Sequence, residues 1–282
     1  MLDLGPDSAQ FCVMTLKMER LREGLGGLEN ALVAYSGGVD SVFLLKTARD
    51  VLGKRVKAVT AISPSYPTYE REESRSLARE MDVEHVEIDT CELDRPEYRA
   101  NRGDRCYFCK SELYETLAAK AKEWGFRWIL NGVNVDDLGD YRPGLKAAEE
   151  WNVRSPLVEA GLTKPEIREL SRELGLRTWN KPALACLSSR FPPGTEVTED
   201  RLRRIDRIET ALVRMGFAGV RVRFHEPIAR IEVGPEAFNR FLDPELRAEV
   251  DRLCRENGFL YSALDLAGYK TGSVNLPLFQ IT

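Results

Sequence analysis

The fold is decided by the stretch Ser36-Gly37-Gly38-Val39-Asp40-Ser41, which lies between a strand signal and a helix signal. Residues 31–35 (ALVAY) have the length and composition of a short apolar strand, and residues 42–48 (VFLLKTA) have the spacing of a buried helix. A strand, a glycine pair and a helix start place backbone N–H groups and the positive end of a helix dipole around an anion. The stretch therefore predicts a turn that binds phosphate groups.

The residues of this turn each suit a nucleotide site. Gly37 and Gly38 permit positive φ and let phosphate oxygens approach the main chain. The hydroxyls of Ser36 and Ser41 add donors, and the Asp40 carboxylate suits a Mg²⁺ ion that bridges phosphates. No Gly-Lys-Ser/Thr follows the glycines, so the turn is not a Walker A loop. It resembles the PP-loop of the ATP pyrophosphatases, which cleave ATP between the α and β phosphates; the alternative is an ordinary strand-to-helix turn.

Length and composition are those of an ordinary globular protein. The chain has 282 residues, of which 43% are hydrophobic and 30% charged, enough for one large or two medium domains. No window approaches the ~18 consecutive apolar residues of a membrane span, and residues 1–7 lack the features of a signal peptide. We therefore expect a cytoplasmic protein without a membrane partner. The net charge of −4 argues against a nucleic-acid partner but does not exclude a local basic groove.

Strand and helix signals alternate over the first part of the chain. The expected strands are residues 31–35, 56–62, 84–89 and 128–132, and the expected helices are residues 16–30, 42–48, 70–81, 110–124 and 163–175. A capping box, Thr163 with Glu166 three residues on, marks the start of the last of these helices. The alternation predicts an α/β fold with a doubly wound parallel sheet. Ligands on such sheets bind beyond the carboxyl ends of the strands, where the first turn and the loops at 61–66 and 131–137 are expected to meet.

A Pro- and Ser-rich stretch at residues 181–195 predicts a functional loop and a domain boundary. Beyond it the expected elements are a helix at 198–215, strands at 219–225 and 229–233, a helix at 235–256 and a strand at 260–266. This order predicts a smaller C-terminal α+β domain. The expected division is a tail at residues 1–15, a PP-loop ATP pyrophosphatase domain at 16–190 and the small domain at 191–282.

Six cysteines in a cytoplasmic protein are more typical of ligands, catalysts or buried thiols than of disulfides. Cys106 and Cys109 form a CxxC just ahead of an expected helix, whose N-terminus favours thiolates, and Cys186 lies in the 181–195 loop. Four interpretations stay open: a structural zinc site that would need a fourth ligand, a redox dithiol, a [4Fe–4S] cluster on the three thiolates, and Cys186 acting alone as nucleophile or sulfur donor. The three-thiolate cluster, with one iron left open to carry hydrosulfide, is the favoured interpretation.

The other three cysteines are not expected to bind a cluster. Cys12 lies in the expected tail and Cys254 inside an amphipathic helix, where a thiol behaves as a small apolar side chain. Cys91 follows a strand near the presumed site but has no partner at a suitable spacing.

Several motifs occur in an order that resembles the LarE family, the ATP-dependent sulfur transferases that make the nickel-pincer nucleotide, the cofactor of lactate racemase. They are the PP-loop at 36–41, residues 101–110 (NRGDRCYFCK), residues 136–144 (DDLGDYRPG) and residues 186–192 (CLSSRFP). The resemblance covers nearly the whole chain after residue 15. It implies a small-molecule nucleotide substrate, pyridinium-3,5-biscarboxylic acid mononucleotide, whose carboxylates become thiocarboxylates.

The resemblance also implies two sulfur sources. Some members sacrifice the sulfur of the single cysteine that matches Cys186, which leaves dehydroalanine, whereas others carry three cysteines and use a [4Fe–4S] cluster catalytically. The presence of Cys106 and Cys109 beside Cys186 resembles the cluster type. We therefore expect ATP, Mg²⁺ and a [4Fe–4S] cluster as cofactors, an external sulfide source, and a homo-oligomer.

The expected chemistry activates a carboxylate by adenylylation, after which a sulfide attacks the activated carbon. The resemblance implies that the catalytic residues are Cys186, Asp40, Lys110 and Arg142, the last two balancing the charges of the substrate. The nucleotide- and substrate-binding residues expected are Ser36, Gly37, Gly38, Ser41, Ala61, Ser63, Gly132, Ser189, Arg190, Arg221 and Arg223. The metal ligands expected are Cys106, Cys109 and Cys186 for the cluster, and Asp40 for Mg²⁺.

Some assignments keep an alternative. Arg221 and Arg223 alternate on one strand face, which suits a phosphate clamp but equally a solvated edge. Glu232 and Asp137 are weaker candidates, because such carboxylates commonly lie on the surface. Two other functions stay open: a tRNA thiolase, which would call for a basic extension, and a nucleotide-binding sensor that binds ATP without forming AMP.

Overall fold

The first half of the chain builds a four-stranded parallel sheet, as predicted. The computed structural model describes residues 6–139 and 143–270. The strands are β1 (Ala31–Ala34), β2 (Val56–Ile62), β3 (Glu84–Asp89) and β4 (Trp128–Leu130), in the order β3-β2-β1-β4, with every neighbouring pair parallel. The chain leaves β1 toward β2 on one side and reaches β4 on the other. The carboxyl ends of β1 and β4 therefore form the switch point where ligands bind on such sheets.

Helices connect these strands, and further helices follow in the second half of the chain. The α-helices of the described chain are α1 (Pro6–Gly26), α2 (Val39–Leu52), α3 (Thr68–Glu80), α4 (Pro96–Arg99), α5 (Arg105–Trp124), α6 (Pro143–Glu150), α7 (Pro156–Glu159), α8 (Lys164–Glu173), α9 (Glu199–Arg214) and α10 (Pro244–Glu256). In the two described ranges, no helix is long and apolar enough to cross a membrane.

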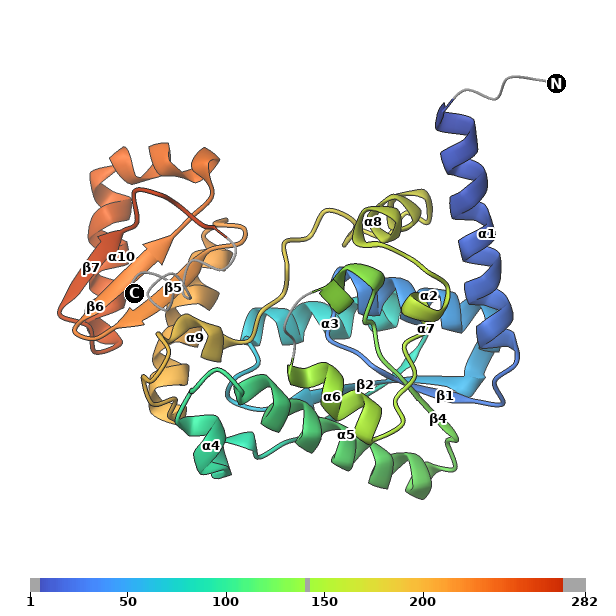
Figure 1. Cartoon of the computed structure of the whole chain (residues 1–282). Helices are drawn as coiled ribbons and strands as arrows, with labels where there is room; N and C mark the ends of the chain where they lie inside the picture. The colour runs from blue at the N-terminus through green and yellow to red at the C-terminus, as the bar shows by residue number, and fades with distance from the viewer. Residues whose placement is uncertain (1–5, 140–142, 271–282) are drawn as a thin grey trace. The chain divides into compact units, whose positions relative to one another are not determined.

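Side chains from both faces of the sheet enter separate cores, because successive strand residues point in opposite directions. Ala31 and Val33 of β1 pack with apolar residues of α1, α2 and α8, whereas Leu32 between them packs with those of α5 and α6. Figure 1 shows α2 and α8 on one face of the sheet and α5 and α6 on the other. Strands buried on both faces are typical of a doubly wound fold and confirm the predicted fold class.

The chain divides into two compact units. The first comprises the described parts of Met1–Ile62, Glu72–Thr90 and Cys106–Ala183, and the second comprises Ser63–Arg71, Cys91–Arg105 and the described part of Leu184–Thr282. The second unit contains a three-stranded sheet of β5 (Arg221–His225), β6 (Ile228–Glu232) and β7 (Tyr261–Leu264), with β6 antiparallel to β5 and parallel to β7. Two short segments from before the expected boundary thus belong to the second unit.

The short helices α4, α6 and α7 have no counterpart among the expected helices, and three of the expected elements differ in their bounds. α1 begins at Pro6, inside the expected tail, and buries a stripe that includes Met14 and Leu21. The helix expected at 235–256 is instead a 3-10 stretch, Pro235–Leu242, followed by α10, because Asp243 accepts a hydrogen bond from Glu245 N (2.9 Å) and Pro244 suits only the first turn. α5 begins at Arg105, so the CxxC lies inside its first turns and not ahead of the helix.

Candidate functional site

The turn between β1 and α2 has the geometry of a phosphate-binding loop. Gly37 has a φ of 71°, and Gly38 caps α2 with extended backbone and no side-chain hydrogen bond. The hydroxyls of Ser36 and Ser41 lie 3.1 Å apart, and Ser41 Oγ also donates to Gly38 O at 3.1 Å. The first N–H groups of a helix have no acceptor within the helix, so this turn presents donors and a positive dipole end together.

Two close approaches explain the glycines at this site. A Cβ atom on Gly37 would lie 3.0 Å from Ser74 Cβ, and a Cβ atom on Gly132 would lie 3.0 Å from Ser41 N. Gly132 follows β4, so the end of β4 lies directly against the first turn of α2. The predicted meeting of the first turn with the 131–137 loop is confirmed.

Asp40 is held by two side chains that sequence reasoning missed. Asn134 Nδ2 donates to Asp40 Oδ1 at 3.2 Å, and Lys164 Nζ lies 2.5 Å from Asp40 Oδ2. Lys164 is the first residue of α8, and its backbone N donates to Asp136 Oδ2 at 2.5 Å. The signal for Asn134 was its position in the predicted 131–137 loop, whereas nothing in the local pattern connects Lys164 with Asp40.

The Asp40 carboxylate fits the expected Mg²⁺ site chemically. Mg²⁺ in nucleotide sites commonly takes one or two carboxylates and completes its shell with phosphate oxygens and water. The side chain of Asp40 is 21% exposed, at the N-terminal turn of a helix that favours phosphate. Within the described ranges, no group of three His, Cys, Asp or Glu side chains is arranged to hold a metal.

Two further polar groups lie at this switch point. Lys181 Nζ lies 2.5 Å from Glu73 Oε2 and 3.3 Å from Gly37 O. Asn131, at the end of β4, accepts hydrogen bonds at Oδ1 from Val133 N and Ser155 Oγ. Its Nδ2 is buried and has no acceptor among the residues that the structure describes. An amide donor left over in this way fits a ligand atom at the site.

Hydrogen bonds from β2 and β3 hold Tyr35, the residue just before the turn. Thr60 Oγ1 on β2 donates to Tyr35 O at 2.7 Å, and His85 Nε2 on β3 lies 2.8 Å from the same hydroxyl. Because the single proton of Thr60 goes to Tyr35, His85 carries its proton at Nε2. The rings of His85 and Tyr35 pack edge to face, with centroids 5.4 Å apart. Burial lowers the pKa of His85, so the neutral ring is the form that suits this place.

The CxxC lies on α5 in the first unit. Cys106 is exposed and Cys109 is partly buried, and residues three apart on a helix are neighbours on its surface. Gly144 packs on this part of α5, where a Cβ atom would lie 2.9 Å from Lys110 Cγ. Arg142 lies outside the described residues. Two accessible thiols on one helix face suit a shared metal centre, and no disulfide joins the cysteines whose side chains the structure describes.

Of the remaining cysteines, Cys254 and Cys91 have described side chains. Cys254 is fully buried in α10, and burial raises the pKa of its thiol to about 12, which makes it a poor ligand. Cys91 is exposed just ahead of a short 3-10 helix. The side chain of Cys12 lies outside the described part.

In the second unit, a buried ion pair holds the loop that carries Cys186. Arg190 and Glu209 have fully buried side chains and form two parallel hydrogen bonds, at 2.9 and 2.8 Å. The same guanidinium donates through Nη1 to the carbonyls of Ala185 (3.1 Å) and Cys186 (3.2 Å) and to Ser189 Oγ (2.9 Å). Arg190 therefore fixes the backbone on both sides of Cys186, and its predicted contact with a ligand stays a prediction.

The two arginines of β5 are buried, so the solvated-edge alternative is wrong. Arg221 is 4% and Arg223 is 5% exposed. Arg223 donates twice to Glu232 Oε2, at 3.0 and 2.8 Å, and once to Ser189 O at 3.0 Å. Glu232 is itself fully buried between Arg223 and Arg230, not a plain surface carboxylate.

The expected site residues thus fall into two groups. The first unit contains Ser36, Gly37, Gly38, Asp40, Ser41 and Gly132 around one turn, Ala61 at the end of β2, and Cys106, Cys109 and Lys110 on α5. The second unit contains Ser63, Cys186, Ser189, Arg190, Arg221 and Arg223. Ser63 donates to Glu92 Oε1 at 2.5 Å. The role of each residue stays a prediction.

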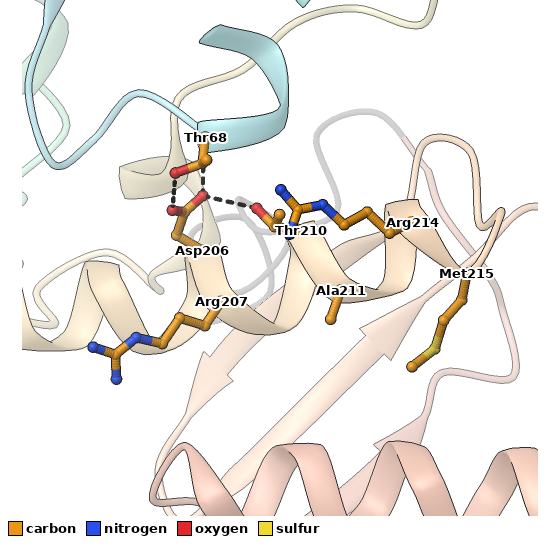
Figure 2. A pocket seen from close by; sticks show the side chains of 7 residues that line it. All are labelled: Thr68, Asp206, Arg207, Thr210, Ala211, Arg214 and Met215. Atoms are coloured by element: carbon orange, nitrogen blue, oxygen red, sulfur yellow. Dashed lines mark hydrogen bonds between the residues drawn. The ribbon is translucent and has the colours of Figure 1, made fainter. Parts of the chain in front are cut away.

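A hollow of about 480 Å³ lies on α9 in the second unit and contains none of the expected site residues. Its lining residues are Thr68, Asp206, Arg207, Thr210, Ala211, Arg214 and Met215 (Figure 2). Asp206 already accepts hydrogen bonds from Thr68 N (2.9 Å) and Thr68 Oγ1 (2.5 Å), so this carboxylate has partners within the chain. The turn between β1 and α2 is the better candidate site.

No protein-family profile matches the chain. Comparison with individual known proteins nevertheless places it in a family. A protein of Synechocystis described as uncharacterized (slr1717) is 47% identical over 262 residues, which cover 93% of this chain and 98% of the relative. The pyridinium-3,5-bisthiocarboxylic acid mononucleotide synthase of Lactiplantibacillus plantarum is 39% identical over 268 residues, which cover 94% of this chain and 96% of the relative. An uncharacterized protein of Methanocaldococcus jannaschii (MJ0830) is 26% identical over 240 residues. Because the match to the named synthase exceeds 30% identity over nearly the full length of both chains, the chain belongs to the LarE family.

Proposed function

We propose that the protein is an ATP-dependent sulfur transferase of nickel-pincer nucleotide biosynthesis. It would convert the carboxylates of pyridinium-3,5-biscarboxylic acid mononucleotide into thiocarboxylates. The name of the Lactiplantibacillus relative specifies a bisthiocarboxylic product and supports this choice of reaction. The observation that carries the ATP part is the turn at Gly37 and Gly38, where Asp40 lies at the N-terminus of α2 and against the end of β4.

The reaction balances in two steps. A carboxylate oxygen of the substrate attacks the α-phosphorus of ATP, and pyrophosphate leaves, which makes an acyl adenylate. Hydrosulfide then attacks the carbonyl carbon and AMP leaves, so a C–S bond replaces a C–O bond. The N–H groups of the turn would stabilise the charge on the departing pyrophosphate. Mg²⁺ bound at Asp40 would supply further neutralisation of that charge.

The iron–sulfur cluster of this proposal would be held by three cysteine thiolates, the donors that such clusters bind. Cys106 and Cys109 lie one turn apart on α5, and Cys186 lies in a loop whose backbone is fixed by Arg190. The chemistry that a cluster held by these three residues supplies when bound is delivery of hydrosulfide as a nucleophile. A fixed loop suits such a ligand, because the thiolate does not have to be ordered at the time of binding.

An anaerobic reaction with ATP, Mg²⁺, sulfide and the dicarboxylate substrate tests the proposal. We expect AMP and pyrophosphate in equal amounts and a nucleotide heavier by the mass difference between sulfur and oxygen. Asp40→Asn should abolish AMP formation. A wild-type chain that forms neither AMP nor thiocarboxylate under these conditions would overturn the proposal.

Iron and sulfide analysis decides between the two sulfur sources. The cluster predicts about four irons and four acid-labile sulfides per chain after anaerobic reconstitution, lost in Cys109→Ala. A protein without iron, whose Cys186 loses the mass of H₂S on turnover, would show sacrificial transfer instead. The cytoplasmic location and homo-oligomeric state expected from the sequence belong to the same proposal, and light scattering measures the latter.

A further inference from the structure

The contact between Asp40 and Lys164 has no part in the reaction as proposed above. We propose that Lys164 is a ligand of the ATP polyphosphate, and that its ammonium moves from Asp40 to a phosphate oxygen when Mg²⁺ and ATP bind. This inference deepens the proposed function and rests on it. It assigns a second charged residue to the nucleotide site.

The backbone of Lys164 is fixed beside the phosphate-binding turn. Its N–H donates to Asp136 Oδ2, and the capping box of Thr163 and Glu166 sets the first turn of α8. Its side chain reaches Asp40 at 2.5 Å and keeps 30% of its surface exposed. An ammonium has three donors, and the contact with Asp40 uses one of them. Lys164 therefore has a fixed backbone and a partly exposed side chain, as an exchangeable ligand should have.

Charge balance favours an exchange over a static pair. A Mg²⁺ ion on the Asp40 carboxylate would repel the neighbouring ammonium, because two cations would share one anion. The polyphosphate brings several negative charges that can accept the ammonium. After the exchange, Asp40 is paired with Mg²⁺ and Lys164 with phosphate, while Asn134 still orients the carboxylate at Oδ1. Each charge has a partner before and after binding.

The exchange makes two predictions of opposite sign for a variant that lacks the ammonium. Lys164→Met keeps most of the apolar stem but removes the charge, so the polyphosphate loses a ligand and binds more weakly. Asp40 in the same variant loses its competitor, so a divalent cation alone binds more tightly. A lysine that only stabilises the fold would produce neither change.

The experiment uses the full-length chain. Calorimetry measures the binding of α,β-methylene ATP with Mg²⁺, because the carbon bridge blocks cleavage between the α and β phosphates. Electron paramagnetic resonance measures the binding of Mn²⁺ alone. For Lys164→Met we expect about tenfold weaker binding of the analogue and tighter binding of Mn²⁺. Lys164→Arg, which keeps the charge, should lose less than about threefold.

The matched control is Lys46→Met. Lys46 pairs with Asp50 at 2.5 Å on α2, the helix that also contains Asp40. The control variant therefore removes a comparable lysine–aspartate pair near the site without changing Lys164. It should change neither affinity. Circular dichroism checks the fold of each variant, and Lys164→Gln replaces Lys164→Met if the latter does not fold.

The outcomes separate this inference from the proposed function. Equal affinity of wild type and Lys164→Met for the analogue overturns the role of Lys164 and leaves the sulfur transferase proposal intact. Unchanged Mn²⁺ affinity in the variant overturns the exchange. A wild-type chain that binds the analogue but forms no AMP in the anaerobic reaction refutes the proposed function, while the binding data still decide the role of Lys164.

Discussion

Gly37 is the residue on which the phosphate-binding turn depends most directly. Its φ of 71° lies in the left-handed region, and a Cβ atom would meet Ser74 Cβ at 3.0 Å. Both features exclude an ordinary L side chain without a shift of the turn. Gly38 differs from Gly37, because its extended backbone is one that other residues also adopt, and it serves as the N-cap of α2.

Gly37→Ala should therefore damage the site more than the fold. We expect the free energy of unfolding to fall by about 1–2 kcal/mol, and the affinity for α,β-methylene ATP to fall by about tenfold or more, because the donors of the turn are displaced. Urea denaturation and calorimetry measure the two quantities. Gly24→Ala is the control: Gly24 lies in α1 with open space where its Cβ would be, so this variant should not lose stability or affinity. Normal nucleotide binding by Gly37→Ala would contradict the assignment of the turn.

At the scale of the element, the loop around Cys186 depends on α9. Glu209 of α9 accepts both arms of Arg190 and also the backbone N–H of Val222 at 2.7 Å. The pair is fully buried, so removal of one partner leaves a buried charge alone. The Cys186 loop, α9 and β5 are therefore joined through a single carboxylate.

Glu209→Ala should lower the free energy of unfolding by about 3–5 kcal/mol, measured by urea denaturation. The double variant Arg190→Met/Glu209→Leu should recover most of this loss, since an apolar pair can replace a buried ion pair. Hydrogen exchange of the backbone near Cys186 should nevertheless be faster in the double variant than in the wild type, because the hydrogen bonds from Arg190 are lost. Glu199→Ala removes an exposed pair with Arg203 on the same helix and should cost less than about 0.5 kcal/mol. A loss of that small size in Glu209→Ala would show that the pair does not hold the loop.

α8 begins at a capping box that was visible in the sequence and is present in the structure. Glu166 Oε2 accepts from Thr163 N at 2.8 Å, and Lys17 of α1 adds an ion pair to the same carboxylate at 2.7 Å. The cap matters for the site because Lys164 is the next residue. A frayed first turn would release the backbone that aims Lys164 at Asp40.

Thr163→Ala should lower the free energy of unfolding by about 1 kcal/mol, and hydrogen exchange should become faster in the first turn of α8. Thr198→Ala is the matched variant, because Thr198 caps α9 through a longer contact with Arg201 N (3.4 Å). Its effect should be smaller. An unchanged exchange rate at Lys164 in Thr163→Ala would show that the cap does not position this residue.

At the scale of the whole molecule, stability should depend on pH through the two histidines of the chain. Burial lowers the pKa of His85, and burial together with the charge of Arg230 lowers that of His225. The unfolded chain then binds protons more readily than the folded one as the pH falls through the unfolded value of about 6.5. Their contribution is complete above that pH and is lost below it.

We therefore expect the free energy of unfolding, from urea denaturation, to decrease between about pH 7.5 and 5.5. The double variant His85→Gln/His225→Gln should show a flatter dependence over this range, because no ring remains to be protonated. A steeper or unchanged slope in the double variant would assign the effect to other groups. Glu166, whose pKa is held low by Lys17 and Thr163 against the effect of burial, contributes only at more acidic pH.

The sequence by itself determined the parts of the molecule that depend on local pattern. The strand signals in the sequence predicted the four strands of the parallel sheet, and the glycine pair predicted the turn after β1. Thr163 and Glu166 predicted the start of α8. These features follow from backbone geometry over a few residues, so neighbours in the chain are sufficient to specify them. The full-length match to the named synthase confirmed the family that the combined motifs indicated.

Only the tertiary structure decided which side chains become neighbours. Lys164 and Asp40 are 124 positions apart in the chain and become neighbours because the start of α8 is bound to the loop after β4. The backbone N–H of Lys164 donates to Asp136 in that loop. Arg223 is buried and not solvated because its guanidinium donates to Glu232, two residues along β6 from its cross-strand partner Arg230, and to Ser189 O. A charged side chain is buried when a distant partner compensates for its lost hydration, and the packing of the elements selects that partner.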